Sequence, residues 1–517
     1  MAELSLDETA AAAPAEAAPA RPRGLAVLAV AAAAWLAFAL AVALRNRAAA
    51  IDDFFITFRY AQNLAAGHGL VFNLGEHAFG TTAPGYALLL GVAAALTRLP
   101  VHWLGEAATV IGLVLMAALA AASARDHRGE ALLGGTLAVT SAYVWLHHGG
   151  EMAVLLALLA GAGCVAERRP GLAGALAASA VWARPDALVA AAGLGALLWW
   201  RRRRLPWSYA IVTGAIVLLG VAAAWWWFGQ PLPGTLAAKR AQAAWSSANW
   251  PSGWRFWAAG YDALAGLYAG RWLPLLIVGG LAGQVPLFRR APLAVQVLAF
   301  YGLAVSVAYP LLGVPFYTWY AVPGLVAVLY GVAYALGAAV RAAATHRPWP
   351  GRLAGAATTL ILLGALVLPL RGSRDLVRPQ PAPRRYMLYR DAGAWLAANS
   401  RPDERFAAAE VGTLGYYSRR GVTDVMGLVS PEVVGRIRQG DLASAFLRHP
   451  TPFVVESSYF RLAPIVEQPW FARKYALAAQ SGVETTWVRV YRLKPGEELP
   501  HRRRAWTPPR ERQHRAG

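Results

Sequence analysis

Apolar residues occur in long, nearly continuous runs along most of the chain, and polar residues gather between these runs. A run of about 18 apolar residues is long enough for a helix to cross a bilayer. The first run covers residues 24–45, so the pattern predicts a polytopic membrane protein. The later runs lie at 84–98, 107–123, 131–147, 152–166, 171–183, 186–200, 208–228, 272–288, 292–311, 322–340 and 353–371.

Arginines between the runs predict the orientation, because loops rich in arginine and lysine stay on the cytoplasmic side. The cluster at 201–204 marks that side, and 168–169, 289–290 and 341–352 lie an even number of runs away from it. With a cytoplasmic N-terminus and an extracytoplasmic C-terminal region, the number of spans must be odd. We therefore interpret 84–98 as a helix that dips into the membrane, which leaves about eleven transmembrane helices.

The pattern divides the chain into a membrane domain at 24–371 and an extracytoplasmic α/β domain at 372–500. Residues 1–23 are rich in Ala, Pro and Glu and predict a disordered cytoplasmic tail. The arginine-rich stretch 501–517 predicts a second disordered tail. A competing interpretation of 24–45 is a signal peptide that is cleaved in the mature protein.

Short periodic segments support the α/β assignment of the C-terminal domain. The stretch from Asp391 to Asn399 places apolar residues on one helical face. The runs 453–455 and 487–491 are short, rich in β-branched and aromatic residues, and predict strands.

Composition agrees with a membrane protein and limits the alternatives. The 517 residues are 57% hydrophobic and only 15% charged, and the net charge is +21. Because the arginines lie between apolar runs, the excess charge predicts membrane orientation rather than a nucleic-acid partner. The single cysteine, Cys164, cannot form an intrachain disulfide. No His or Cys spacing typical of a metal site occurs, so we predict no metal and no other cofactor, with a divalent metal left open.

The outer loop at 46–83 carries the most specific chemistry. Asp52 and Asp53 directly follow the first apolar run and stand beside aromatic residues. Two carboxylates at a membrane boundary are costly unless they are paired or functional, and mutual repulsion would raise one pKa toward that of a general base. A helix cap or an interfacial acidic pair would explain them equally well. The length and polarity of the loop favour a functional role.

Other polar and aromatic residues are predicted to converge on the same side of the membrane. Glu151 begins one run, and Arg184 and Asp186 lie at the turn between two others. Each has a simpler explanation, such as a helix cap or an ion pair within a turn. Together they predict an outer vestibule that could bind a lipid phosphate and a sugar. The remaining members of this set are Lys239, Trp319 and Tyr320.

These motifs resemble bacterial GT-C glycosyltransferases, and most closely the mycobacterial terminal arabinofuranosyltransferases. The resemblance runs from about residue 51 to 430, and the segment 52–60 is its most specific part. A departure is Gly234, where relatives usually show an asparagine. The further segments that carry the resemblance are 67–73, Gly75-Glu76, Gly150-Glu151, 184–186, 229–235 through Lys239, Trp319-Tyr320 with Pro323, 412–417 and 424–428.

The resemblance implies an all-α polytopic GT-C membrane domain with a small α/β C-terminal domain. It implies a polyprenyl-phosphate sugar donor at the outer leaflet and Asp52 as the catalytic base, with Asp53 as orienter or alternate base. Arg59, Arg184 and Lys239 are the predicted donor-phosphate ligands, the last two foremost. The predicted substrate-binding residues are Tyr60, His68, Glu151, Asp186, Trp319 and Tyr320.

We therefore predict an inverting glycosyltransferase of cell-envelope assembly in a bacterial inner or plasma membrane. It would transfer a sugar, with arabinofuranose a candidate, to an extracytoplasmic glycan, lipid or protein. Its predicted partners are the donor, this acceptor and the lipid bilayer, but not nucleic acid. The alternatives are a flippase or transporter of lipid-linked sugars, an enzyme like the protein O-mannosyltransferases or lipid A-modifying relatives, and a non-enzymatic envelope protein.

Overall fold

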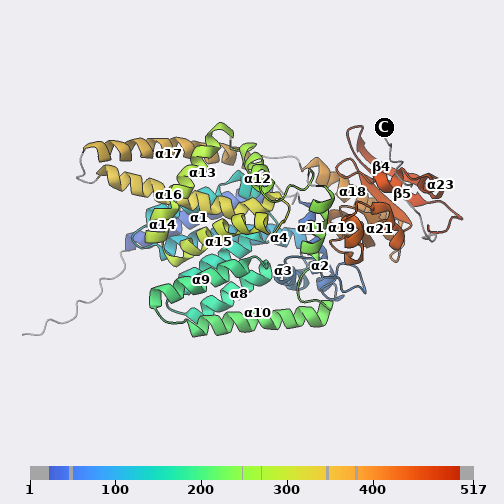
Figure 1. The fold of residues 1–517 in the computed structure, drawn as a ribbon, viewed down its shortest axis with the longest axis horizontal. Helices are drawn as coiled ribbons and strands as arrows, with labels where there is room; N and C mark the ends of the chain where they lie inside the picture. The colour runs from blue at the N-terminus through green and yellow to red at the C-terminus, as the bar shows by residue number, and fades with distance from the viewer. Residues whose placement is uncertain are drawn as a thin grey trace, which may run out of the picture.

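The computed structural model describes residues 22–45, 51–246, 248–268, 270–344, 349–378 and 382–500. The predicted disordered tails lie outside the described residues, apart from the start of the first helix at Pro22. Long helices form one elongated body, and a sheet with its own helices forms the other end of the molecule (Figure 1). The predicted fold class, helical with a small α/β part at the C-terminus, is confirmed, while the predicted domain boundaries stay predictions.

Five helical segments are long and apolar enough to cross a membrane, and three shorter apolar helices accompany them in the described residues. The protein is therefore a multi-pass membrane protein, while the number of eleven spans stays a prediction. The five segments are α1 (Pro22–Arg45), α4 (Val101–Ser123), α10 (Trp207–Phe228), α15 (Leu293–Leu311) and α16 (Val322–Ala344) with the 3-10 turn before it. The shorter ones are α3 (Pro84–Thr97), α7 (Met152–Val165) and α8 (Pro170–Ala183).

Two predicted runs are interrupted. The run 131–147 divides into α5 (Arg128–Val139) and α6 (Ala142–Trp145), because the Ser141 hydroxyl caps α6 by accepting from the Val144 amide at 3.3 Å. The run 272–288 divides at Gly283 into α13 (Leu273–Ala282) and α14 (Gln284–Arg290). A Cβ at Gly283 would lie 1.8 Å from a carbonyl oxygen of α16, so a close helix crossing requires glycine here. The other helices of this domain are α9 (Ala187–Arg202), α12 (Arg255–Ala265) and α17 (Trp349–Leu376).

The C-terminal domain is a five-stranded mixed sheet in the order β2-β1-β3-β5-β4. Its central pairs are parallel between β1, β2 and β3, and antiparallel between β3, β5 and β4. The predicted strands are confirmed within β3 and β5, and the predicted helix lies within α18 (Arg384–Asn399). The strands are β1 (Arg405–Ala408), β2 (Gly421–Asp424), β3 (Phe453–Ser457), β4 (Tyr475–Val483) and β5 (Thr486–Leu493).

Helix α2 (Asp52–Ala65) joins the two domains. Phe55 is fully buried, and its ring lies 5.3 Å from Tyr416 and 5.9 Å from Tyr417 of α19 (Gly412–Ser418). Further along the outer loop, the Asn73 amide bonds both the N–H and the carbonyl of Val422 on the edge strand β2. The outer loop is thus packed between the domains, which fixes the direction of the carboxylates at the start of α2.

Candidate active site

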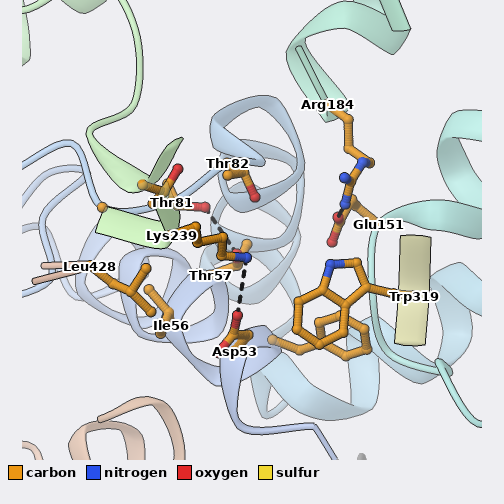
Figure 2. Close-up of a pocket in the computed structure, with 13 residues that line it drawn as sticks. Asp53, Ile56, Thr57, Thr81, Thr82, Glu151, Arg184, Lys239, Trp319 and Leu428 are labelled. Atoms are coloured by element: carbon orange, nitrogen blue, oxygen red, sulfur yellow. Dashed lines mark hydrogen bonds and ion pairs between the residues drawn. The ribbon is translucent and has the colours of Figure 1, made fainter. Parts of the chain in front are cut away.

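The Asp53 carboxylate and the Lys239 ammonium face each other across a narrow pocket (Figure 2). Asp53 lies in the first turn of α2, and Lys239 lies in α11 (Thr235–Trp245), with 3.4 Å between Oδ2 and Nζ. Lys239 is buried, whereas the Asp53 side chain is 29% exposed. The pocket therefore contains an accessible carboxylate beside a buried cation.

Three aromatic rings surround the Lys239 ammonium. Nζ lies 4.3 Å from the ring centre of Tyr317, 5.0 Å from that of Trp319 and 5.5 Å from that of Tyr320. Burial lowers the pKa of Lys239, but Tyr320 and Asp53 raise it by more, so the pKa lies above its usual value. The interactions around Lys239 therefore favour its protonated form, and a single carboxylate is its ion-pair partner among the described residues.

A loop from the first outer segment closes the pocket with hydroxyl groups. Thr57 and Thr81 share a hydrogen bond of 2.9 Å, and Thr82 lies beside them in Figure 2. Tyr60 lies behind this loop, where its hydroxyl donates to the Ala78 carbonyl at 2.6 Å and accepts from the Gly80 amide at 2.9 Å. Tyr60, predicted to touch substrate, is instead buried and positions the loop. These threonines were not among the predicted site residues. The turn-rich sequence around Thr81 and Thr82 was the feature that could have indicated them.

Arg184 forms a separate buried cluster at the far side of the pocket. Its guanidinium donates to Glu151 at 2.5 Å, to Asp186 at 2.8 Å and to the Tyr309 hydroxyl at 3.0 Å. Tyr301 donates to the other Asp186 oxygen at 2.8 Å. The structure thus brings the predicted residues together, but two carboxylates already neutralise Arg184. Its geometry is that of a structural ion cluster beside the pocket rather than of a cation open to a phosphate.

Replacing Arg184 by glutamine is expected to lower the free energy of unfolding by about 3–5 kcal/mol, because two buried carboxylates lose their cation. Denaturant unfolding in detergent micelles measures this change. Arg201→Gln is the control, since the Arg201–Glu167 pair is half exposed and worth at most about 1 kcal/mol. Equal stability losses in the two variants would contradict the interpretation.

Asp52 differs from Asp53 in what it binds. Its two carboxylate oxygens accept from the backbone amides of Gly412 at 2.9 Å and Thr413 at 2.8 Å. Burial raises its pKa above the usual value, although the two amides and nearby Arg385 lower it. A Cβ at Gly412 would lie 1.9 Å from the Asp52 carbonyl oxygen. The geometry therefore anchors Asp52 between α2 and α19 and leaves Asp53 facing Lys239. Which of the two aspartates is the base stays a prediction.

Arg59 and His68 lie away from this pocket, in a hollow on another face of α2. Arg59 was predicted to bind the donor phosphate, and His68 to bind substrate. An α-helix turns by about 100° per residue, so the spacing already separates Arg59 from the face of Asp53, but only the fold shows which elements pack against each face.

Two larger spaces adjoin the pocket. A cleft of about 750 Å³ between the domains shares Asp53 and Trp319 with it and is lined with aromatic side chains, including Trp245, Trp250 and Tyr459. A groove of about 600 Å³ on the other side lies between α3, α7, α8 and α10 and is lined mainly by apolar residues. The loop that supplies Thr81 and Thr82 separates this groove from the pocket, since Phe79 and Pro84 line the groove.

Within the described residues, no three or more His, Cys, Asp or Glu side chains group as metal ligands would. That the activity needs no metal stays a prediction.

Comparison with solved structures decides the fold. The structure of ArnT from Cupriavidus metallidurans bound to undecaprenyl phosphate aligns with a TM-score of 0.52 at 14% identity, over 91% of this chain and 98% of that one. The chain has the GT-C fold. The apo form of ArnT from the same organism aligns with a TM-score of 0.50 at 16% identity, over 91% of this chain and 98% of that one.

The GT-C assignment rests on the two ArnT structures, and the other comparisons add nothing to it. Arabinofuranosyltransferase AftD from Mycobacteria aligns at 16% identity and a TM-score of 0.45, over 90% of this chain and 41% of that one. Residues 380–493 match a family model described as a domain of unknown function, DUF8728. A comparison with curated proteins finds no match. The predicted GT-C relationship is therefore confirmed at the level of the fold.

Proposed function

We propose that this protein is a glycosyltransferase that uses a polyprenyl-phosphate sugar as donor. One observation carries the proposal: Asp53 and Lys239 form an ion pair in a pocket that opens into an aromatic-lined cleft and that a single loop separates from an apolar groove. A lipid-linked sugar needs these three environments side by side, namely an apolar surface for its prenyl chain, a cation for its phosphate and an open cleft for the acceptor. The shared GT-C fold, and the lipid phosphate bound to ArnT in its solved structure, support the same proposal.

The prenyl chain of the donor would lie in the groove between α3 and α10. The α10 helix is mostly exposed on its surface, as expected of a helix that faces lipid, and Trp182 and Trp227 line the groove beside it. The phosphate at the end of the chain would then reach the threonine loop and Lys239. Threonine hydroxyls and the lysine ammonium can all donate hydrogen bonds to phosphate oxygens.

The acceptor would enter through the cleft between the domains, where aromatic faces and charged groups can hold a polar molecule. Arg385 and Glu410 form an ion pair on the wall of this cleft. A glycan suits such a wall because its C–H faces pack on aromatic rings while its hydroxyls bond charged side chains. A lipid or a protein that presents a hydroxyl would satisfy the same chemistry.

In the reaction, Asp53 would accept the proton of the acceptor hydroxyl. The acceptor oxygen forms a bond to the anomeric carbon while the bond from that carbon to the phosphate oxygen breaks. Polyprenyl phosphate leaves with the bonding electrons, and Lys239 meets the charge that develops on it. Attack from the face opposite the leaving group inverts the anomeric configuration. The active site and the C-terminal domain would face the outside of a bacterial inner or plasma membrane.

A transfer assay tests the proposal. The full chain in nanodiscs is incubated with a panel of radiolabelled polyprenyl-phosphate sugars, with arabinofuranose among them, and with a mixture of envelope glycans as acceptors. We expect label to pass from one donor to an acceptor and polyprenyl phosphate to form in equal amount. If no donor supports transfer and lipid-linked sugar instead crosses the bilayer of proteoliposomes, the protein is a flippase and the proposal is wrong.

A further inference from the structure

A second hollow, of about 600 Å³, lies on the face of α2 opposite the candidate active site. An α-helix turns by about 100° per residue, so Gln62, nine positions after Asp53, points to the opposite side of α2. Helix α2 therefore separates the two spaces. The hollow is bounded by α2, by the α3–α4 turn and by α19 of the C-terminal domain.

Arg59 forms the floor of this hollow and lacks an anionic partner. The residue is 3% exposed, and within the described residues its one hydrogen bond runs from Nη1 to the Gln62 amide oxygen at 2.7 Å. Its Nε is buried without a hydrogen-bond partner among the described residues. Burial and the positive charges of Arg419 and Arg420 lower the pKa of Arg59 to about 10. A buried guanidinium with an unused N–H is costly unless an anion binds it.

Two more arginines stand at the mouth of the hollow. Arg98 caps the C-terminal end of α3 and Arg419 that of α19, both with left-handed backbone and both exposed. Neither takes part in an ion pair within the described part of the chain. None of the described residues that line the hollow is acidic. Three guanidinium groups thus line one hollow without a carboxylate. Val101, which also lines it, is the first residue of α4, and the N-terminus of a helix carries a partial positive charge.

An exposed apolar strip leads along α3 to this mouth. The strip consists of Val92 and Leu96, which are 48% and 80% exposed on one face of the helix. Leu88 and Leu89, earlier in α3, line the groove between α3 and α10 and belong to that groove. Leu99 continues the strip and also lines the hollow. In a multi-pass membrane protein such a strip lies against lipid, with cationic side chains at the level of the headgroups.

We propose that this hollow is an anion site that binds the phosphate of an outer-leaflet lipid, separate from the active site. The phosphate oxygens would accept from the free Nε of Arg59 and from the guanidinium groups of Arg98 and Arg419, while the acyl chains lie along the α3 strip. Free inorganic phosphate could bind the same three guanidinium groups, but it has no acyl chain to pack against the apolar strip. A phosphate bound in this hollow would contact both α2 and the end of α19. Lipid binding would therefore be coupled to the position of the C-terminal domain.

Equilibrium binding to the delipidated full chain in neutral detergent tests the proposal. The probes are radiolabelled dioleoyl-phosphatidylglycerol, the zwitterionic dioleoyl-phosphatidylcholine and inorganic phosphate. We expect saturable binding of phosphatidylglycerol, and about tenfold weaker binding in the double variant Arg98→Gln/Arg419→Gln, because two charge-assisted contacts are lost. Both side chains are exposed, so this variant should fold. Arg59→Gln should weaken binding as well.

Arg401→Gln is the matched control, because Arg401 is an exposed arginine of the same domain that lies outside the hollow. It should bind phosphatidylglycerol as the native chain does. Equal binding by the double variant and the control, or equal binding of phosphatidylcholine and phosphatidylglycerol by the native chain, would overturn the proposal. Displacement of phosphatidylglycerol by inorganic phosphate at similar concentration would overturn the lipid as the source. The readout is lipid binding, so it does not depend on sugar transfer.

Discussion

Replacing Asp53 by asparagine is expected to reduce sugar transfer about 100- to 10,000-fold while the donor still binds. The carboxylate is accessible in the pocket, and in the proposed reaction its loss removes the group that takes the acceptor proton. Asparagine has nearly the same shape and can keep an amide oxygen toward Lys239, so a neutral contact replaces the ion pair without a steric change. Single-turnover transfer and donor binding, measured on the same nanodisc preparation, separate the two effects.

Asp52→Asn is the matched control for this prediction. Asp52 uses both oxygens to accept backbone amides of α19, and an asparagine can accept only with one. We expect a loss of stability of about 1–3 kcal/mol from the unpaired amide. The folded fraction should keep far more transfer activity than Asp53→Asn. The opposite ranking, with Asp52→Asn inactive and Asp53→Asn active, would give the role of base to Asp52.

Replacing Lys239 by methionine is expected to reduce transfer about 100- to 1,000-fold, the second largest effect. The ammonium is the cation nearest Asp53, and its three aromatic neighbours fix its position before the donor arrives. Preorganised charge aimed at a leaving group stabilises the transition state more than the ground state, so the rate constant should fall further than donor affinity. Methionine keeps an unbranched side chain of similar length and removes the charge together with the N–H donors.

Arg240→Met provides the comparison for Lys239. Arg240 is the next residue of α11 and is exposed, so its replacement removes one positive charge from the same helix without touching the pocket. We expect nearly unchanged transfer. If Arg240→Met and Lys239→Met lose activity to the same degree, a general charge effect on the membrane surface would explain both, and the assignment of Lys239 would be wrong.

Local patterns predicted those features that depend on neighbours in sequence. Apolar runs predicted the helices of the membrane domain, and short runs rich in β-branched and aromatic residues predicted β3 and β5. Both predictions succeeded because the residues of a single segment already show whether it is buried in lipid or in a sheet. The breaks at Ser141 and Gly283 were missed: the first is a local cap by one hydroxyl within an apolar run, and the second depends on a close crossing with α16.

The sequence by itself determined the membrane class, the two-domain organisation and the residue types of the candidate site. Only the tertiary structure decided which of these residues meet. It paired Asp53 with Lys239, gave Asp52 to the amides of α19, and neutralised Arg184 with two carboxylates. It also turned Arg59 to the opposite face of α2. The physical reason is that charge pairing depends on distances of a few ångströms between segments far apart in the chain, and packing of α2 between the two domains sets those distances.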